Sequence, residues 1–437
     1  MSGETAGIGR DLTDAVAPGT LLSGAAAAAH PVDGVRPRFV AAPTTVAGVE
    51  RVLALANARR LAVVPTGGGA RLGWGAPPRR LDVLLSLARL DRILAHEPAD
   101  LTLSVECGVT IEALDAALRP YRQFVPIDAP RPRTSTIGGL IATGAAGPYR
   151  ARYGTMRDLL VGVTVVRADG TLVKGGGRVV KNVTGYDIPK LHVGALGTLG
   201  VVVEAHLRLH PRPAEERTWM FPFPSAEAAL DAALEIRGTA VVLSRCQLFT
   251  AVALGALGDA APPGAALVVT VGSVAAAVRA QGAQVAEICG RAGGTPREVS
   301  EADEWWRRAA EVLWPPEGAA SLTLRVGTRP TDVVKALRAM EAVAGKQLVA
   351  TADLATGVLQ GTLTPVEAPR VADIVTRTRD ALATLGGSCV VEHAPVSAKA
   401  GLDVWGDVGP ALGPMQRLKR ELDPADVLNP GRYVGGI

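Results

Sequence analysis

Three consecutive glycines, Gly67, Gly68 and Gly69, carry the clearest chemical signal in this 437-residue chain. They follow the apolar run 61–65, which is typical of a buried strand. Because glycine has no side chain, three successive backbone amides in the turn after this strand are open to a ligand. Consecutive N–H groups in such a turn form a nest for an anion, and Arg71 adds a positive charge nearby. We expect this loop to bind a pyrophosphate, whereas a flexible turn is the alternative for the loop taken alone.

Two further glycine-rich stretches indicate that the ligand is large. They are residues 135–154 (STIGGLIATGAAGPYRARYG) and residues 181–202 (KNVTGYDIPKLHVGALGTLGVV). Glycine lets the backbone approach a phosphate or an aromatic ring, and it supplies the positive φ angles of the surrounding turns. The chain contains neither G-x-G-x-x-G nor G-x-x-x-x-G-K-[ST], which disfavours the two common nucleotide-binding folds. We therefore expect one long cofactor, held along its length by three loops.

Strands and helices must position these loops. Up to residue 209 the patterns predict a mixture of both: strands at 61–65, 81–85, 101–107 and 201–209, helices at 46–60, 110–118 and 137–143, and a hairpin of 159–167 with 171–174. The sequence pattern changes near Pro211 and Pro213, and we place the main domain boundary there.

The second part predicts a separate domain. Helices are expected near 225–237, 275–291 and 302–312, with strands near 240–249 and 266–271, and two strand–helix–strand units follow over 321–352 and 357–392. This order favours an antiparallel sheet with helices on one face. A last helix is expected at 415–422. We thus expect an α+β protein with domains at 1–212 and 213–412, and a C-terminal helix and tail at 413–437 that return to the first domain.

Composition excludes several classes of function. The 46 Lys and Arg against 42 Asp and Glu give a net charge of +4 with no basic cluster, which disfavours a nucleic-acid surface. The run Ala25 to Ala29 is too short for a signal peptide or a membrane span. We expect a cytoplasmic protein, at the inner membrane only where a partner holds it there.

No metal site is expected. The four cysteines are far apart and form no C-x-x-C pair, so they predict isolated reduced thiols rather than a zinc site or an iron–sulfur cluster: Cys107, Cys246, Cys289 and Cys389. His206 and His210 alternate with Arg208 along one strand, which favours a polar outer face over a metal site. Trp305 and Trp306 lie in a patterned helix and predict packing rather than base stacking.

The order of the motifs resembles a known family. The sequence P-x-G-G-G-x-x-x-x-G, then S-T-I-G-G with A-T-G and Y-G, then G-Y-D and G-x-L-G-T-L-G-V, is similar to the FAD-binding domain of the vanillyl-alcohol-oxidase and FAD-linked oxidase superfamily. The run VKNVTGYD at 180–187 and the ending LNPGR at 428–432 resemble more closely the smaller flavoprotein subunit of bacterial glycolate oxidase. The likeness covers about 39–213 and the last twenty or so residues. It implies a two-subdomain FAD-binding domain of the PCMH type followed by an α+β cap.

The resemblance also implies which residues bind FAD. The pyrophosphate loop would comprise Pro65, Thr66, Gly67, Gly68, Gly69, Ala70, Arg71 and Leu72. The isoalloxazine and ribityl side would be lined by Asp128, Ser135, Thr136, Gly138, Gly139, Ala142 and Gly144, followed by Tyr153 and Gly154, with Gly200, Val201 and Val202 at the adenine or the ring edge. Members with covalent FAD use a His in the first loop or a Cys in the second segment. This chain has neither, so we expect noncovalent FAD, with His393 as the remaining candidate for a covalent link.

The substrate implied by the resemblance is a small 2-hydroxy acid such as glycolate or D-lactate. Its oxidation needs a cation for the carboxylate, a base for the hydroxyl proton, and the α-carbon held against the flavin. Arg325, at a strand centre, is the candidate for the carboxylate, with an outward solvated side chain as the alternative. The family motif H-x-G-D-G-N-x-H is absent, and E-H-A-P at 392–395 is a degenerate form of E-H-G. His393 is therefore a catalytic candidate, with a surface-loop histidine as the alternative.

Three functions remain open at this point. The first is a dehydrogenase subunit that passes electrons to a separate iron–sulfur subunit, in a hetero-oligomer with a homologous flavoprotein subunit. The second is a non-catalytic FAD-binding subunit of such a complex, which the missing histidine motif supports. The third is an alcohol or aldonolactone oxidase that uses oxygen.

Overall fold

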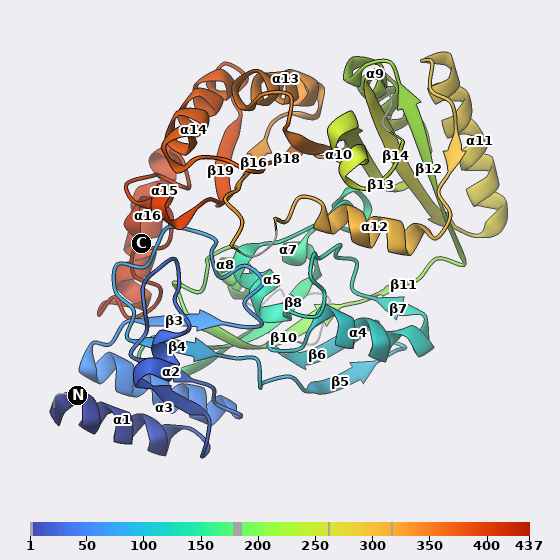
Figure 1. Cartoon of the computed structure of the whole chain (residues 1–437). Helices are drawn as coiled ribbons and strands as arrows, with labels where there is room; N and C mark the ends of the chain where they lie inside the picture. Colours follow the sequence, from blue (N-terminus) through green and yellow to red (C-terminus); the bar gives the residue numbers. More distant parts are fainter. Residues whose placement is uncertain (1–2, 178–185, 261–262, 316–317) are drawn as a thin grey trace.

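The computed structural model describes residues 3–177, 186–260, 263–315 and 318–437 of the chain. Two bodies are visible in Figure 1: a lower one that carries the N-terminus, which we call the N-terminal lobe (elements up to β11), and an upper one, which we call the cap (β12 to α15). Within these described residues, every helix is too short or too polar to cross a membrane. Part of the motif VKNVTGYD, at 180–185, lies outside the described ranges.

The first sheet of the lobe ends at the glycine loop. Its strand order is β1 (Leu21–Ser23), β2 (Phe39–Ala41), β4 (Val83–Ser86) and β3 (Val63–Thr66), and β4 runs parallel to both β2 and β3. Helix α3 (Val46–Arg59) connects β2 to β3; Thr45 caps it by accepting a hydrogen bond from the amide of Gly48. Helix α1 (Gly3–Ala15) packs on α3, so the sheet is anchored on one side by two helices.

The second sheet of the lobe is antiparallel. Its order is β5 (Ile93–Glu97), β6 (Thr102–Glu106), β10 (Val201–Arg208), β8 (Leu160–Val166) and β9 (Leu172–Gly176). Val203, Ala205 and Leu207 of β10 are fully buried. The shorter elements of the lobe are α2 (Gly24–Ala28), α4 (Ile111–Leu118), η1 (Arg119–Tyr121), β7 (Gln123–Phe124), α5 (Ile137–Thr143), α6 (Arg150–Tyr153), α7 (Met156–Leu159), α8 (Ile188–His192) and β11 (His210–Pro211).

The cap is built on one eight-stranded antiparallel sheet, as the sequence predicts. Its order is β15 (Arg297–Glu298), β12 (Glu215–Phe223), β14 (Ala265–Ser273), β13 (Leu243–Thr250), β17 (Val349–Asp353), β18 (Val358–Leu363), β16 (Leu322–Gly327) and β19 (Ser388–His393). The helices packed against one face are α9 (Ala226–Arg237), α11 (Ala275–Arg291), α13 (Val333–Ala344) and α14 (Ala368–Ala383).

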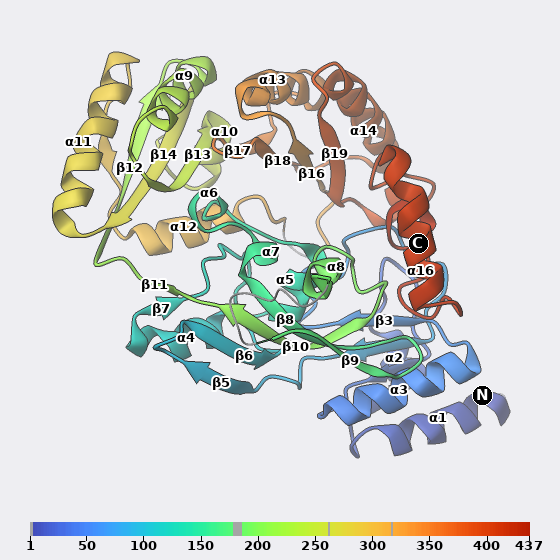
Figure 2. The same ribbon diagram turned by 180° about the vertical axis from the view of Figure 1, so that it is seen from behind.

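The expectation that helices cover a single face is wrong. Helices α10 (Ala251–Ala256) and α12 (Ala302–Glu311) pack on the opposite face, where Met220 and Val268 contact the buried Trp306. The physical reason is that β14 is apolar on both faces, so each face needs a cover. Trp305 and Trp306 are packing residues, as expected. In both views α12 lies between the cap sheet and the lobe (Figures 1 and 2).

The end of the chain returns to the first sheet of the lobe. After β19 come α15 (Val396–Lys399), η3 (Gly409–Ala411), α16 (Leu412–Leu422) and η4 (Val434–Gly436). The amide of Val63 donates to Val427, and the amide of Asn429 donates to Val63, so the tail runs beside β3 (Figure 2). This places the tail next to the first glycine loop.

Candidate cofactor and substrate site

The first glycine loop presents a row of amides without acceptors. Residues 67–71 follow β3, and within the described chain none of their five backbone N–H groups has a hydrogen-bond acceptor. Gly69 has φ +79°, and a Cβ added there would meet nothing within 4 Å. Five consecutive free amides are a donor set that suits a pyrophosphate. The loop therefore fits the anionic part of a dinucleotide.

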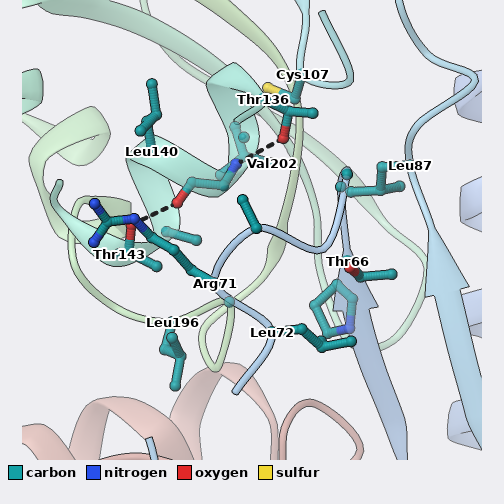
Figure 3. A pocket seen from close by; sticks show the side chains of 18 of the residues that line it. Thr66, Arg71, Leu72, Leu87, Cys107, Thr136, Leu140, Thr143, Leu196 and Val202 are labelled. Carbon is teal, nitrogen blue, oxygen red and sulfur yellow. Dashed lines mark hydrogen bonds between the residues drawn. The ribbon is translucent and has the colours of Figure 1, made fainter. Parts of the chain in front are cut away.

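The second segment packs directly against this loop. A Cβ on Gly67 would lie 2.1 Å from Thr136 Oγ1, and one on Gly68 would lie 2.3 Å from the carbonyl oxygen of Thr134. Thr136 caps α5 by accepting from the amide of Gly139 at 3.2 Å, while Thr143 donates to the carbonyl of Gly139 at 2.7 Å (Figure 3). These glycines are thus required for two loops to touch.

The third segment and the tail complete the enclosure. The amide of Leu196 donates to the carbonyl of Ala142, which ties the third segment to α5. Asn429 Nδ2 donates to Leu196 at 2.6 Å. Arg432, buried, donates to the carbonyls of Leu72 and Trp74 and to Asn429 Oδ1. One C-terminal segment therefore fastens the first loop to the third.

A first cavity joins all three segments. The sequence-predicted residues that line it are Pro65, Thr66, Gly67, Gly68, Gly69, Ala70, Arg71, Leu72, Ser135, Thr136, Gly138, Gly139, Ala142, Gly200, Val201 and Val202. The sequence reasoning missed His192, Asn429 and Arg432, which also line it. The N-P-G-R run was the signal for the last two, but no pattern placed it beside the glycine loop.

Four residues expected at the cofactor lie elsewhere. Gly144 lines a second cavity and Asp128 a third. The Asp128 carboxylate accepts from Arg245 of the cap at 2.8 Å and from the amide of Tyr149 at 2.8 Å. Tyr153 packs edge-on against the rings of Phe124, Tyr149 and His210. A Cβ on Gly154 would lie 2.6 Å from the Asp158 carboxylate, which forms the capping box of α7. Asp128, Tyr153 and Gly154 differ from expectation because structural partners occupy them.

Burial sets the charge state around the first cavity. It lowers the pKa of His192 to about 4, so this imidazole is neutral near pH 7. Burial also raises the pKa of the Cys107 thiol, a lining residue, which keeps it protonated. A protonated thiol is a poor nucleophile, so the site favours a noncovalent cofactor.

A second cavity of about 310 Å³ lies between the lobe, the cap and the tail. It shares Ala142, Thr143 and Leu196 with the first cavity, so the two are adjacent. Its remaining lining is Trp74, Gly144, Gly194, Arg325, Val390, Trp405, Val408, Met415, Tyr433 and Val434. Arg325 is thus the one charged residue among the described residues that line it.

Arg325 faces the cavity but already has a counter-ion. Its Nε lies 3.0 Å from Glu392 Oε1, and its guanidinium lies 5.6 Å from the ring centroid of Trp74. Glu392 is buried and accepts a hydrogen bond from Gln360 Nε2 at 2.8 Å. Arg325 lies in a strand of the cap, as expected, and lines the second cavity, but no sequence pattern indicates its carboxylate partner on the neighbouring strand.

His393 does not reach any of these three cavities. It is the last residue of β19 rather than part of a surface loop, and burial lowers the pKa of its imidazole. Its Nε2 is buried and has no hydrogen-bond partner in the described chain. The structure therefore does not bring His393 and Arg325 together at one site.

The fold and the site define a flavin-type dinucleotide-binding protein. A row of free amides lines a cavity of the lobe, and a second cavity under the cap adjoins it. That donor set and that extent fit FAD.

Comparison with known proteins identifies the family. Residues 37–176 match the FAD binding domain, and residues 212–433 match the C-terminal domain of FAD linked oxidases. The chain therefore belongs to the FAD-linked oxidases, and it is an FAD-dependent oxidoreductase. The superfamily likeness expected from the motifs and the predicted fold class are confirmed.

Relatives and a solved structure agree with this assignment. The chain is 26% identical over 421 residues to the glycolate oxidase subunit GlcD of Bacillus subtilis, covering 91% of this chain and 88% of the relative. It is 28% identical to a probable mitochondrial D-lactate dehydrogenase of Danio rerio, covering 91% and 84%. A D-2-hydroxyglutarate dehydrogenase of Xanthomonas citri pv. viticola is 38% identical over 194 residues, which span 44% of this chain and 41% of that protein. The fold is similar to that of p-cresol methylhydroxylase, with TM-score 0.78 at 18% identity over 99% and 97% of the two chains.

Proposed function

We propose that this chain is an FAD-dependent dehydrogenase that oxidises a small 2-hydroxy acid, such as glycolate or D-lactate, to the 2-oxo acid. The observation that carries the proposal is the adjacency of the two cavities at Ala142, Thr143 and Leu196. The similarity to a glycolate oxidase subunit and to a probable D-lactate dehydrogenase supports this class of substrate. For this function we assign residues 1–212 to FAD binding, 213–412 to the cap and 413–437 to the returning tail.

The chain's own residues would hold and orient the substrate. FAD, when bound, supplies an acceptor for the hydride that leaves the α-carbon, while the hydroxyl proton leaves to a base or to water. The apolar walls of the second cavity, among them Trp74, Trp405 and Tyr433, exclude water from the reacting carbon. Cationic guanidinium groups at the lobe–cap interface would bind the carboxylate.

Anaerobic titration of the purified protein tests the proposal. A panel of glycolate, D- and L-lactate and D-2-hydroxyglutarate is added while the visible flavin absorbance is followed. We expect one or more of these acids to bleach the oxidised flavin and to form the matching 2-oxo acid in equal amount. Catalysis by this chain would be rejected if dithionite bleaches the flavin but none of the acids does, with or without partner subunits.

The electron acceptor we propose is a separate iron–sulfur protein. All four cysteines are free and buried, and burial raises the pKa of each thiol, which makes them poor cluster ligands. Such a protein would accept the substrate's two electrons in one-electron steps. Reoxidation of the substrate-reduced protein by the purified partner would support the dehydrogenase. Peroxide formation in air would instead support an alcohol or aldonolactone oxidase that uses oxygen. The cytoplasmic location remains a prediction.

One observation favours a second candidate function, a non-catalytic FAD-binding subunit in a hetero-oligomer. The described lining of the second cavity contains neither an imidazole nor a carboxylate that could accept the hydroxyl proton. Turnover by the chain alone would exclude this candidate. Firm FAD binding with turnover restored only by a homologous flavoprotein subunit would favour it.

A further inference from the structure

Three arginines, Arg71, Arg150 and Arg325, are close enough to influence one another at the lobe–cap interface. Arg71 differs from the others in having no ion pair of its own, although the carboxylate of Glu392 attracts it at longer range. Arg150 Nε lies 4.0 Å from Asp353 Oδ2, and Arg325 Nε lies 3.0 Å from Glu392 Oε1. No described carboxylate lies within ion-pair distance of Arg71. Arg71 is half-buried, and a cation withdrawn even partly from water without a partner is costly, so its retention indicates a site for an anion.

The surroundings of Arg71 hold the side chain but leave its polar edge unused. The guanidinium carbon lies over the indole of Trp74, 5.0 Å from its centroid, and over that of Trp314 at 4.6 Å. Indole faces stabilise a cation but accept no conventional hydrogen bond from its N–H groups. The Nε atom of Arg71 is buried and has no hydrogen-bond partner in the described chain. A planar guanidinium stacked in this way can still bind a carboxylate along its edge.

The cap supplies neutral polar groups opposite Arg71. Arg71 lines a third cavity together with Gln247, Thr351 and Gln360, which come from three adjacent strands of the cap sheet. Gln360 is also the cross-strand partner of Arg325. Their amide donors are already engaged, because Gln247 Nε2 donates to Thr351 Oγ1 at 3.1 Å and Gln360 Nε2 donates to Glu392 Oε2 at 2.8 Å. Asp128 also lines this cavity, but its carboxylate is paired with Arg245, so Arg71 is the one cation among the described lining residues and has no ion-pair partner.

We propose that Arg71 is the residue that binds the substrate carboxylate, and that the Arg325–Glu392 pair positions the cap strand beside it. This inference rests on the proposed function, and it moves the carboxylate from Arg325 in the second cavity, which Arg71 does not line, to the first glycine loop, where Arg71 lines the first and third cavities. Arg71 also lines the cofactor cavity, so binding of an FAD phosphate is the competing role. The two roles predict opposite results for one variant.

The test uses the FAD-loaded protein and simple probes, and it needs no turnover. Binding of oxalate and acetate, with neutral acetamide as the matched control, is followed by the flavin difference spectrum and by tryptophan fluorescence. In Arg71→Met we expect the dissociation constants of both carboxylates to rise about tenfold or more, with acetamide binding and FAD content unchanged. Added guanidinium chloride should restore part of the affinity. Arg71→Lys keeps the charge, so its dissociation constants for the carboxylates should lie between those of Arg71→Met and those of the unsubstituted protein. In the control Arg89→Met, at an exposed position, the dissociation constants should equal those of the unsubstituted protein.

Two results would overturn the inference. One is loss of FAD in Arg71→Met while the reloaded protein binds carboxylates as before, which would assign Arg71 to the cofactor. The other is unchanged carboxylate affinity in Arg71→Met and Arg71→Lys with full FAD content. Because no substrate is oxidised in this experiment, failure of the proposed function shows separately, as absence of flavin reduction by every 2-hydroxy acid.

Discussion

At the scale of single residues, Lys419 is a buried cation with complete partners, in contrast to Arg71. Its ammonium donates to Asp423 Oδ2 at 2.6 Å and to the carbonyls of Thr198 and Leu428. These bonds connect α16 to the third glycine segment and to the tail. The positive charge of Lys419 therefore stabilises the fold, because acceptors surround it. The positive charge of Arg71 is available to bind an external anion.

Removing the counter-ion of Lys419 should destabilise the fold. In Asp423→Asn the buried ammonium loses its nearer carboxylate, while Asp426 Oδ1 stays 3.6 Å away, and we expect the free energy of unfolding to fall by about 3–5 kcal/mol. Urea denaturation followed by tryptophan fluorescence measures this change. Arg420→Met, at an exposed position of the same helix, is the control and should stay within about 0.5 kcal/mol. A loss below about 1 kcal/mol in Asp423→Asn would contradict this role of the pair.

His192 should contribute a pH dependence of stability. Burial lowers its pKa from 6.5 to about 4, so the unfolded chain binds more protons than the folded one between these values. Stability is therefore lost as the pH falls from about 7 toward 4, and the part due to His192 is about 2 kcal/mol at pH 5. His192→Gln should reduce the difference in unfolding free energy between pH 7 and pH 5 by that amount. Equal pH dependence in His192→Gln and in the control, exposed His30→Gln, would refute the assignment.

The sequence predicted some site residues well because their environment is local. The glycine loop at 67–69 and the cap of α5 at Thr136 depend on neighbours within a few positions, and both lie where the motifs imply. Asp128 was assigned to the cofactor, yet its carboxylate pairs with Arg245, 117 residues away. No spacing rule reveals such a partner, and the same holds for Glu392 beside Arg325.

At the scale of elements, period and capping predicted most helices and strands of the lobe, and the hairpin of β8 and β9. Helix α1 was missed, although Ile8, Leu12 and Ala15 follow helical spacing and are buried. The cap was predicted in outline but not in its layers, because an apolar run such as β14 does not show which helix covers each face. Packing of distant elements settles that choice.

The contact between the first two glycine loops should be indispensable. In Gly68→Ala the new methyl group would lie 2.3 Å from the carbonyl oxygen of Thr134, which belongs to rigid backbone. We expect FAD affinity to fall at least tenfold, because the loops must separate and their amides diverge. Fluorescence titration of the apoprotein with FAD gives the affinity. Gly290→Ala, in open space on α11, should leave it unchanged; equal affinity in both variants would show that the loops adapt.

At the scale of the whole molecule, a buried ion pair joins lobe and cap. The Arg245 and Asp128 side chains are only 5% and 8% exposed, and the guanidinium lies 3.5 Å over the ring of Tyr149. Since the second and third cavities lie between the two bodies, this pair helps to fix their shape. The cap is therefore positioned by groups outside the cofactor cavity.

Asp128→Asn should separate stability from cofactor binding. We expect it to lower the free energy of unfolding by about 3–5 kcal/mol, because Arg245 stays buried with a weaker partner. FAD affinity should stay within about twofold, since Asp128 does not line the first cavity. Thermal unfolding and FAD titration of the same sample measure both. A selective loss of FAD affinity would contradict this prediction and would show that Asp128 takes part in cofactor binding. The control is Glu235→Gln, which breaks an exposed ion pair with Arg291 and should change neither quantity appreciably.

The central claim is that three distant glycine segments and the C-terminal tail enclose one FAD molecule. Its most direct test is acid precipitation of the purified protein, followed by identification and counting of the flavin in the supernatant and in the pellet. We predict one FAD per chain, all of it released to the supernatant. Retention of the flavin in the pellet, release of FMN in place of FAD, or failure of the apoprotein to bind added FAD would contradict the account.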